Sequence, residues 1–283
     1  MTMFETKLDM FHTLNQWNAM TFKDALKKIH GDKEVLKLAE LVLKKQGISD
    51  KPMNGCASEG LKTIEAERLR ITYVSIFNQL IQTKPQWNMA DCIYAVCEHA
   101  LKDKEFYYKK AGTLGYSFER IVWLMCGRMI RSLPSFIREI QLENSLQQAF
   151  PKAHMDRSEK LDTTLHCDIA MTINGENYYV WSFVKSDRSI KNFCQKFSGK
   201  RYGHVPDGYH VLCPFDVFSS NSVCFNGWAM YSNEYVHSIK DAIKHKGKYQ
   251  YDTVCLNGTI YSSEFYNKPV VITKTSMPLS NVV

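Results

Sequence analysis

The chain has 283 residues and a formal net charge of +7. Apolar residues make up 45% and charged residues 23% of it, ordinary values for a globular protein that exclude a disordered or fibrous chain. At about 100–200 residues per domain, this length fits one large domain or two smaller ones. No run of about 18 apolar residues occurs and residues 1–14 contain no signal-peptide core, so we expect no membrane segment and a cytoplasmic location.

Nine cysteines are scattered along the chain without a Cys-x-x-Cys pair, and we therefore expect reduced thiols in a cytosolic protein. The nearest approach to a metal pattern is Cys92 and Cys97 followed by His99. On a helix, positions five apart point in different directions, so we expect no zinc site there. The positive net charge is a mild indication of an anionic partner.

Apolar residues recur at helical spacing through most of the first 150 residues, so we expect this part of the chain to be helical. Asn88 is a typical first residue of a helix, and Gly47 and Gly112 are typical residues just beyond the end of one. Ser132 and Pro134 indicate a break. The predicted helices span residues 21–47, 58–84, 88–110 and 115–133, and a further helix runs to Phe150.

Beyond residue 150 the pattern changes to short runs of branched and aromatic residues. Residues 167–173 and 178–185 flank the pair Asn174-Gly175, which is typical of a β-hairpin. A short helix over 189–198, a buried strand over 209–215 and a mixed tail with one helix near 236–245 follow. The sequence therefore predicts an α+β protein with a mixed α/β core. Its expected parts are a helical N-terminal region (1–112), the core (113–220) and a β-rich C-terminal extension (221–283).

Asp168 and Lys185 belong to the two strands of this predicted hairpin. If the loop is only Asn174-Gly175, Asp168 lies opposite Trp181, and Lys185 is about four residues, or roughly 13 Å, further along the strand. If the loop has four residues, Asp168 lies opposite Phe183, and Lys185 comes diagonally within reach. Strand side chains alternate between faces, so either register puts Asp168 and Lys185 on one face of the sheet.

A carboxylate beside a lysine at a strand end suits phosphodiester hydrolysis. The carboxylate can hold Mg²⁺, a hard cation that takes oxygen ligands. The metal polarises the phosphate and lowers the pKa of its bound water, while the lysine orients that water or stabilises the developing charge.

This order of elements resembles the restriction-endonuclease-like PD-(D/E)XK nuclease family. In that family a helix with an acid precedes a hairpin, whose first strand carries a metal-binding Asp and whose second strand carries an acid-x-Lys pair. A helix and a further strand follow. The resemblance covers the middle of the chain, with helix 115–133 and its Glu119 as the first element. It implies a central sheet flanked by helices, a Mg²⁺ ligand in Asp168, and a lysine, Lys185, that assists the attacking water.

The chain departs from the family at Phe183, two residues before Lys185, where the family has its second metal-binding acid. We place Glu119 first and Asp187 second as the acid that completes the metal site with Asp168. If neither reaches the site, the metal loses a ligand and the fold persists without catalysis.

A basic stretch begins at Lys185. It contains one acid, Asp187, and Tyr202 and His204 are interleaved at its end. Cations of this kind on a helix from residue 189 project toward a phosphate backbone. We therefore expect contacts with DNA from Arg188, Lys191, Lys196, Lys200 and Arg201.

These features favour a Mg²⁺-dependent endonuclease of double-stranded DNA, in which Asp168, Lys185 and Glu119 are the catalytic residues. The alternative is a catalytically silent nuclease-like fold that binds DNA or a protein, as a defence or anti-defence regulator would. The family resemblance also implies a homodimer, because such enzymes often dimerise to cut both strands. The sequence contains no phosphate-binding loop of the nucleotide or dinucleotide type, so we expect no nucleotide cofactor.

Overall fold

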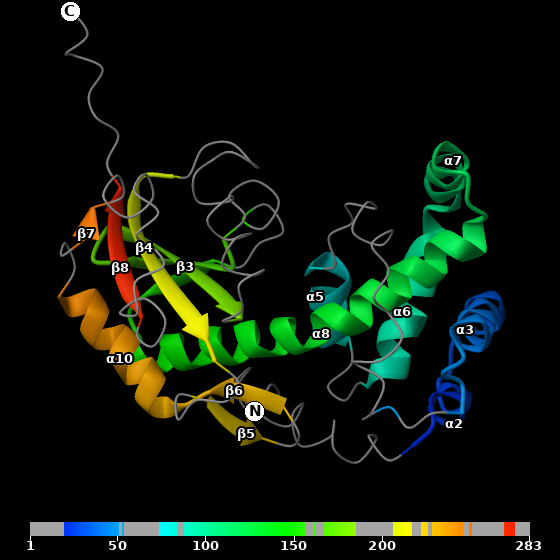
Figure 1. Cartoon of the computed structure of the whole chain (residues 1–283), viewed down its shortest axis with the longest axis horizontal. Helices are drawn as coiled ribbons and strands as arrows, with labels where there is room; N and C mark the ends of the chain where they lie inside the picture. Colours follow the sequence, from blue (N-terminus) through cyan, green and yellow to red (C-terminus); the bar gives the residue numbers. More distant parts are fainter. Residues whose placement is uncertain are drawn as a thin grey trace, which may run out of the picture. The chain divides into compact units, whose positions relative to one another are not determined.

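The computed structural model describes residues 20–50, 53, 74–83, 88–156, 161, 167–184, 206–216, 222–225, 228–245, 249–250 and 269–274 (Figure 1). The chain divides into two compact units, Met1–Pro134 and Ser135–Val283. The division expected from the sequence, after residues 112 and 220, stays a prediction. No helix within the described ranges is both long and apolar enough to cross a membrane.

The described part of the N-terminal unit is helical, as predicted. Helix α6 is central to it and contacts α2, α3, α5 and α7. On α6 the buried face includes Ile93, Val96 and Ala100. The helices of this unit are α2 (Phe22–Lys27), α3 (Lys33–Gln46), α5 (Val74–Thr83), α6 (Met89–Lys102), α7 (Lys104–Leu114) and the first part of α8 (Phe118–Ala149).

Two predicted helices are each divided in two. The helix expected over 21–47 is interrupted before Asp32, whose carboxylate accepts hydrogen bonds from the N–H groups of Glu34 (2.8 Å) and Val35 (3.2 Å) and so begins α3. The helix expected over 88–110 is interrupted at Asp103, where the backbone (φ −117°, ψ 43°) leaves the helical region. Apolar residues continue to recur at helical spacing across both breaks, so the sequence pattern does not reveal where the helices are interrupted.

Local start and stop signals are confirmed at Asn88 and Gly47. Asn88 caps α6 and forms a reciprocal capping box with Asp91. Gly47 ends α3 in the left-handed conformation, at φ 67°. Gly112, however, lies inside α7, which continues to a left-handed Gly115 (φ 69°).

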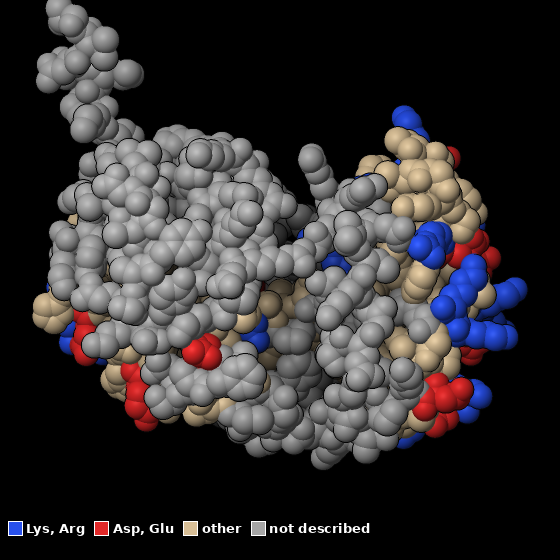
Figure 2. All heavy atoms as spheres, viewed as in Figure 1, with Lys and Arg blue, Asp and Glu red and all other residues tan. Residues whose placement is uncertain are grey.

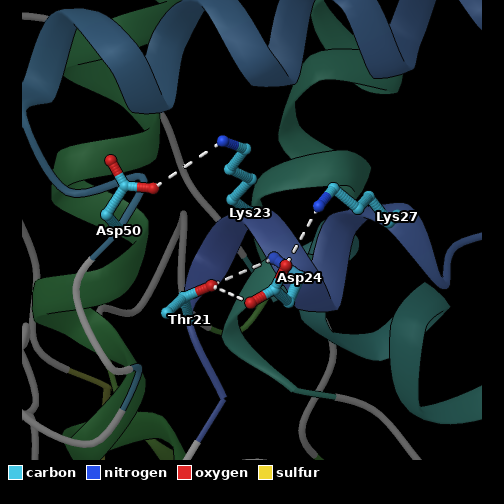
Figure 3. Close-up of polar contacts among 5 residues, drawn as sticks. All are labelled: Thr21, Lys23, Asp24, Lys27 and Asp50. Atoms are coloured by element: carbon cyan, nitrogen blue, oxygen red, sulfur yellow. Dashed lines mark hydrogen bonds and ion pairs between the residues drawn. The ribbon is translucent and has the colours of Figure 1, made fainter.

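Charges of both signs are interspersed on the visible face of the N-terminal unit (Figure 2). At the start of α2, the Thr21 hydroxyl accepts a hydrogen bond from the Asp24 N–H (3.1 Å) and donates one to its carboxylate (2.8 Å) (Figure 3). The same carboxylate accepts from Lys27 Nζ (3.1 Å), and Lys23 lies 3.9 Å from Asp50. The hydrogen bond from Thr21 and the charge of Lys27 lower the pKa of Asp24.

Helix α8 continues through Ser132 and Pro134, where the sequence predicted a break. A proline inside a helix removes a backbone hydrogen bond and costs about 3 kcal/mol. Met129 and Leu133 before the proline and Ile137 after it are fully buried. Since each such side chain gains about 1.5–3 kcal/mol on burial, the packed face outweighs the missing bond.

A six-stranded mixed sheet forms the described centre of the C-terminal unit, in the order β1-β2-β3-β4-β8-β7. Its strands are β1 (His154–Asp156), β2 (Ile169–Ile173), β3 (Glu176–Val184), β4 (Gly208–Phe215), β7 (Tyr249–Gln250) and β8 (Val270–Lys274). The pairs β3–β4 and β7–β8 are parallel, and the other neighbours are antiparallel. A two-stranded sheet, β5 (Ser222–Phe225) and β6 (Trp228–Tyr231), and helix α10 (Asn233–Lys244) complete the described elements.

These elements confirm the predicted α+β class. The strand expected over 209–215 is β4, and the helix expected near 236–245 is α10. The helix expected over 189–198 lies outside the described residues.

The central strands are buried on both faces. Helix α10 and the C-terminal part of α8 lie along one face (Figure 1), where they pack against Met171, Tyr178, Val180, Val211, Cys213 and Phe215. On the opposite face Trp181, His210, Leu212 and Ile272 are buried as well. Such two-sided burial is typical of strands beside a parallel pair.

The β2–β3 hairpin turns at Asn174 (φ 51°) and Gly175 (φ 82°), which confirms the predicted turn. Two positive φ angles indicate a type I′ turn, whose twist matches that of the flanking strands. Gly208 begins β4 at φ 138°, and a Cβ there would lie 2.9 Å from the carbonyl oxygen of Asn177. Close approach of β3 and β4 therefore requires glycine at this position.

Candidate functional site

Asp168 immediately precedes β2 and is half-buried. Its N–H donates to the carbonyl oxygen of Val180 (3.3 Å), and its carboxylate Oδ2 accepts a 2.6 Å hydrogen bond from the N–H of Ser182. At this end of the hairpin, the backbone hydrogen bonds between its strands are thus followed by one from a backbone N–H to a side-chain carboxylate. The carboxylate that the sequence singles out has a structural partner.

The hairpin adopts the tighter of the two registers considered from the sequence. Ile173 pairs with Glu176 and Ile169 with Val180, so the position opposite Asp168 is Trp181. Val184, the last residue of β3, is three positions beyond Trp181, or about 10 Å along the strand. The four-residue loop, which would have brought Lys185 diagonally within reach of Asp168, is not the one that forms.

Ser182 connects Asp168 to a buried tyrosine. Its hydroxyl lies 2.8 Å from the hydroxyl of Tyr231, which in turn donates to the carbonyl oxygen of Cys213 (2.9 Å). Because a phenol has one proton and a carbonyl can only accept, the Ser182 hydroxyl is the donor to Tyr231. These hydrogen bonds connect β3, β4 and β6 on the face of the sheet that α8 and α10 cover.

Two further side chains hold this arrangement. Gln141 on α8 donates to the carbonyl oxygen of Tyr231 and accepts from its N–H, both at 3.2 Å. Tyr235 on α10 donates to the carbonyl oxygen of Pro214 (2.9 Å) and its ring stacks on that of Tyr231. The position of Tyr231 is therefore fixed through both its backbone and its ring.

The electrostatics of these groups exclude ready ionisation. Burial raises the pKa of the Tyr231 hydroxyl well above its usual range, and Cys213 and Asp168 add to the effect. Burial also raises the pKa of the Cys213 thiol, with a further contribution from the charge of Asp168. Near neutral pH both groups therefore remain protonated, and the Tyr231 hydroxyl serves as the hydrogen-bond donor to the carbonyl oxygen of Cys213.

Arg138 on α8 is the buried cation of this region. Its guanidinium carbon lies 4.6 Å from the ring centre of Phe215, the last residue of β4, and its Nη2 donates to Ser135 Oγ (3.0 Å). Burial lowers the pKa of the guanidinium, an effect that Tyr231 and Glu139 oppose. Sequence reasoning missed Arg138 because its contact with Phe215 joins residues that are distant in the sequence.

Glu119 lies in the first turn of α8, in the N-terminal unit, and is half-buried. Its position suits an acid favoured by the helix dipole. Asp168 lies in the C-terminal unit, so the proposed metal pair of Glu119 and Asp168 stays a prediction. In the part of the chain that the structure describes, no group of three or more His, Cys, Asp or Glu side chains is arranged to hold a metal ion.

The remaining predicted site residues lie outside the described residues. They are Lys185, Asp187, Arg188, Lys191, Lys196, Lys200 and Arg201. Their roles stay predictions, supported by the sequence alone.

A hollow of about 250 Å³ is lined mainly by residues of β1, β2 and β3. Its polar lining comes from His154 and Asp156 on β1, Thr172 on β2, and Asn177 and Tyr179 on β3. None of the residues selected from the sequence is among those that line it.

Comparison of the chain with protein-family models, with curated proteins and with solved structures finds no match in any of the three.

Proposed function

We propose that this chain is a DNA-binding protein with a nuclease-like sheet, in which Asp168 stabilises the hairpin instead of binding a catalytic metal. The observation that carries the proposal is the 2.6 Å hydrogen bond from the Ser182 N–H to the Asp168 carboxylate. Withdrawing Oδ2 from this bond to ligate a metal would leave the half-buried N–H of Ser182 without its acceptor, at a cost of up to about 1–3 kcal/mol.

The residue beside Asp168 supports the same interpretation. With Trp181 opposite Asp168, Phe183 is the diagonal neighbour on the adjacent strand. This is where the resemblance requires the second acid, and a phenylalanine ring cannot coordinate Mg²⁺. The nuclease-like arrangement of strands is thus retained in the proposal, and metal catalysis is not.

DNA is the proposed partner because of the charge of the chain. The net charge is +7, and residues 185–201 contain six basic side chains and one acid. Binding that depends on such cations weakens as salt rises, with a slope of about 0.9 per phosphate contact.

The first experiment measures binding of a fluorescent duplex of about 20 base pairs in EDTA at several salt concentrations. We expect binding to weaken with salt, and the double variant Lys196→Gln, Lys200→Gln to lower the salt slope by about two. Lys23→Gln with Lys27→Gln, on the surface of α2, is the matched control and should change the slope less. Duplex binding that ignores salt would contradict the proposal.

Two substitutions of Asp168 distinguish a structural role of its carboxylate from a metal-binding role. Asparagine retains an oxygen that can accept from the Ser182 N–H, whereas alanine does not. We therefore expect Asp168→Asn to keep wild-type folding and duplex affinity, and Asp168→Ala to unfold more easily. Equal stability of the two variants would argue against the structural role.

A second candidate function is Mg²⁺-dependent cleavage of double-stranded DNA. It is favoured by the order of the elements, in which α8 precedes the hairpin, β4 lies parallel to β3, and Asp168 stands at the start of β2. Plasmid cleavage with Mg²⁺, Mn²⁺ or EDTA tests it in the wild type, Asp168→Asn and Lys185→Ala. We expect no cleavage, and metal-dependent cutting that both variants abolish would establish the nuclease.

A further inference from the structure

The hollow on β1, β2 and β3 lies over a row of three side chains whose middle member is small. Ala170 on β2 pairs with Asp156 on β1 and with Tyr179 on β3, so the three side chains share one face of the sheet. All three line the hollow. A methyl group between two larger side chains leaves the space above it unfilled, and the hollow of about 250 Å³ includes this space.

The ring of Tyr179 leans toward the next strand, β4, and is held there. It stacks on the buried ring of His210, with 5.3 Å between ring centres and 25° between ring planes. Gly208 gives the tyrosine room, because a Cβ on residue 208 would lie 3.1 Å from Cε2 of Tyr179. Strand β2 lies on the opposite side of β3 from β4, so the other side of the ring faces Ala170 and the hollow.

Hydrogen-bonding groups surround this aromatic wall. The Oδ1 atom of Asn177 accepts from the Thr172 hydroxyl (3.1 Å), which leaves the amide N–H groups of Asn177 for another acceptor. Both residues line the hollow, as does His154 on β1. The Tyr179 hydroxyl and the His154 ring have no hydrogen-bond partner among the residues that the structure describes. A flat ligand with donors and acceptors along its edge would suit this combination.

We propose that the hollow binds an unpaired base of a DNA strand, stacked on the free side of Tyr179. Every nucleobase has a flat aromatic face and a hydrogen-bonding edge, and stacking on an aromatic side chain tolerates all four bases. A cavity of about 150 Å³ accepts a benzene ring, so about 250 Å³ has room for a purine. The inference rests on the proposed function, because DNA supplies the base.

The base must be outside the double helix to enter. A paired base is stacked on both faces, and its edge is occupied by its partner, so an enclosed site takes it only after it has left the stack. Strand β3 continues from Tyr179 to Val184, five positions or about 16 Å further, where the basic stretch 185–201 begins. The phosphates of a strand whose base occupies the hollow therefore lie close to the start of that stretch.

Three variants in the full-length chain isolate the hollow. Tyr179→Leu removes the aromatic face, whereas Tyr179→Phe keeps it without the hydroxyl. Ala170→Ile fills the hollow with a residue that favours strands, so this variant should fold. Tyr209→Leu is the matched control, because Tyr209 also stacks on a tyrosine of the neighbouring strand, Tyr178 (4.9 Å), but packs on the face that α8 and α10 cover.

The measurement compares two fluorescent duplexes in EDTA, one fully paired and one with a single unpaired adenine at its centre. We expect the wild type to bind the second duplex about tenfold more tightly, because a stacked base adds to the phosphate contacts. Tyr179→Phe and Tyr209→Leu should keep this preference, and Tyr179→Leu and Ala170→Ile should lose it. Equal affinity of the wild type for both duplexes would overturn the site, as would a preference that Ala170→Ile retains.

Thermal unfolding of each variant shows whether it is folded. Tyr179→Leu loses the stack on His210 as well as the wall of the hollow, so it is the variant more prone to unfold. If it does not fold, Ala170→Ile decides, since it leaves both rings in place.

Free deoxyadenosine monophosphate, as a third probe, lets the two proposals fail separately. If the wild type binds this nucleotide, Ala170→Ile does not, and neither duplex binds, the base site stands and the DNA-binding function is rejected. If the wild type binds both duplexes equally and more weakly as salt rises, the base site is rejected and the DNA-binding function stands.

Discussion

The indole N–H of Trp181 donates a 3.1 Å hydrogen bond to Nδ1 of His210 on the neighbouring parallel strand, and both side chains are buried. Nε2 of His210 lies 2.9 Å from the carbonyl oxygen of Pro206. Because Nδ1 accepts from the indole and a carbonyl can only accept, the ring proton is on Nε2. A hydrogen bond between two buried side chains therefore also links β3 and β4 on the face of the sheet opposite α8 and α10.

This pair predicts the effect of Trp181→Phe. Phenylalanine retains an aromatic ring but leaves Nδ1 of His210 buried without its donor, so the free energy of unfolding should fall by about 1–3 kcal/mol, in addition to the lost packing. Urea denaturation at neutral pH measures it. Trp123→Phe, at a half-buried position on α8, is the control and should cost less; equal losses in the two variants would contradict the role of His210.

Gly208→Ala and Gly112→Ala should change stability in opposite directions. Alanine at residue 208 would need a positive φ of 138° and would bring its Cβ within 2.9 Å of the Asn177 carbonyl oxygen, so we expect a loss of at least about 1 kcal/mol. Gly112 lies inside α7 with no heavy atom within 4 Å of an added Cβ, and alanine there should gain about 0.5–1 kcal/mol. Thermal denaturation of both variants tests the pair, and a stabilised Gly208→Ala would show that β4 begins differently.

Five cysteines should resist alkylation in the folded chain. Burial excludes the reagent and raises the pKa of the Cys126 and Cys213 thiols, which keeps them protonated. Brief iodoacetamide labelling followed by peptide mass spectrometry should find protection at Cys92, Cys97, Cys126, Cys167 and Cys213. The same protein in urea is the control and should label at all five. Fast labelling of any of them under native conditions would place that residue at the surface.

Tyr107 should make stability depend on pH in the alkaline range. Burial, with a smaller contribution from Asp103, raises the pKa of Tyr107 to about 12, from an ordinary value of 10.0. The unfolded chain therefore loses the phenolic proton first, so the stability that Tyr107 contributes is complete below about pH 10 and is lost as pH rises toward 12.

The matching measurement compares the wild type with Tyr107→Phe. The difference in unfolding free energy between them should be constant from about pH 7 to 9 and should then shift against the wild type by up to about 1.4 kcal/mol per pH unit. Tyr108→Phe, at an exposed position on α7, is the control. A constant difference up to pH 11 would contradict the raised pKa.

Sequence reasoning succeeded where the signal is local. The turn at Asn174-Gly175 was predictable because its positive φ angles select those two residues. The continuation of α8 through Pro134 was not, because it depends on burial of Met129 and Ile137 by residues distant in the sequence. The general rule that proline breaks a helix takes no account of that packing.

The candidate site could likewise be predicted from the sequence only where the signal is local. The placement of Asp168 at the start of the hairpin follows from the alternating pattern, but its bond to Ser182 depends on a register that the sequence left open between two loop lengths. Tyr231 and Arg138 escaped notice because they join the site from β6 and α8 through tertiary contacts. No short motif brings such residues together.

The order of strands in the sheet has a consequence for biosynthesis. Strand β4 pairs on one side with β3 and on the other with β8, whose residues Val270–Lys274 are translated more than 50 positions later. Until the ribosome has released β8, one edge of β4 has no strand to pair with, and an apolar edge of this kind invites association with other chains. Nascent chains arrested before residue 270 should therefore need chaperones more than the complete chain does.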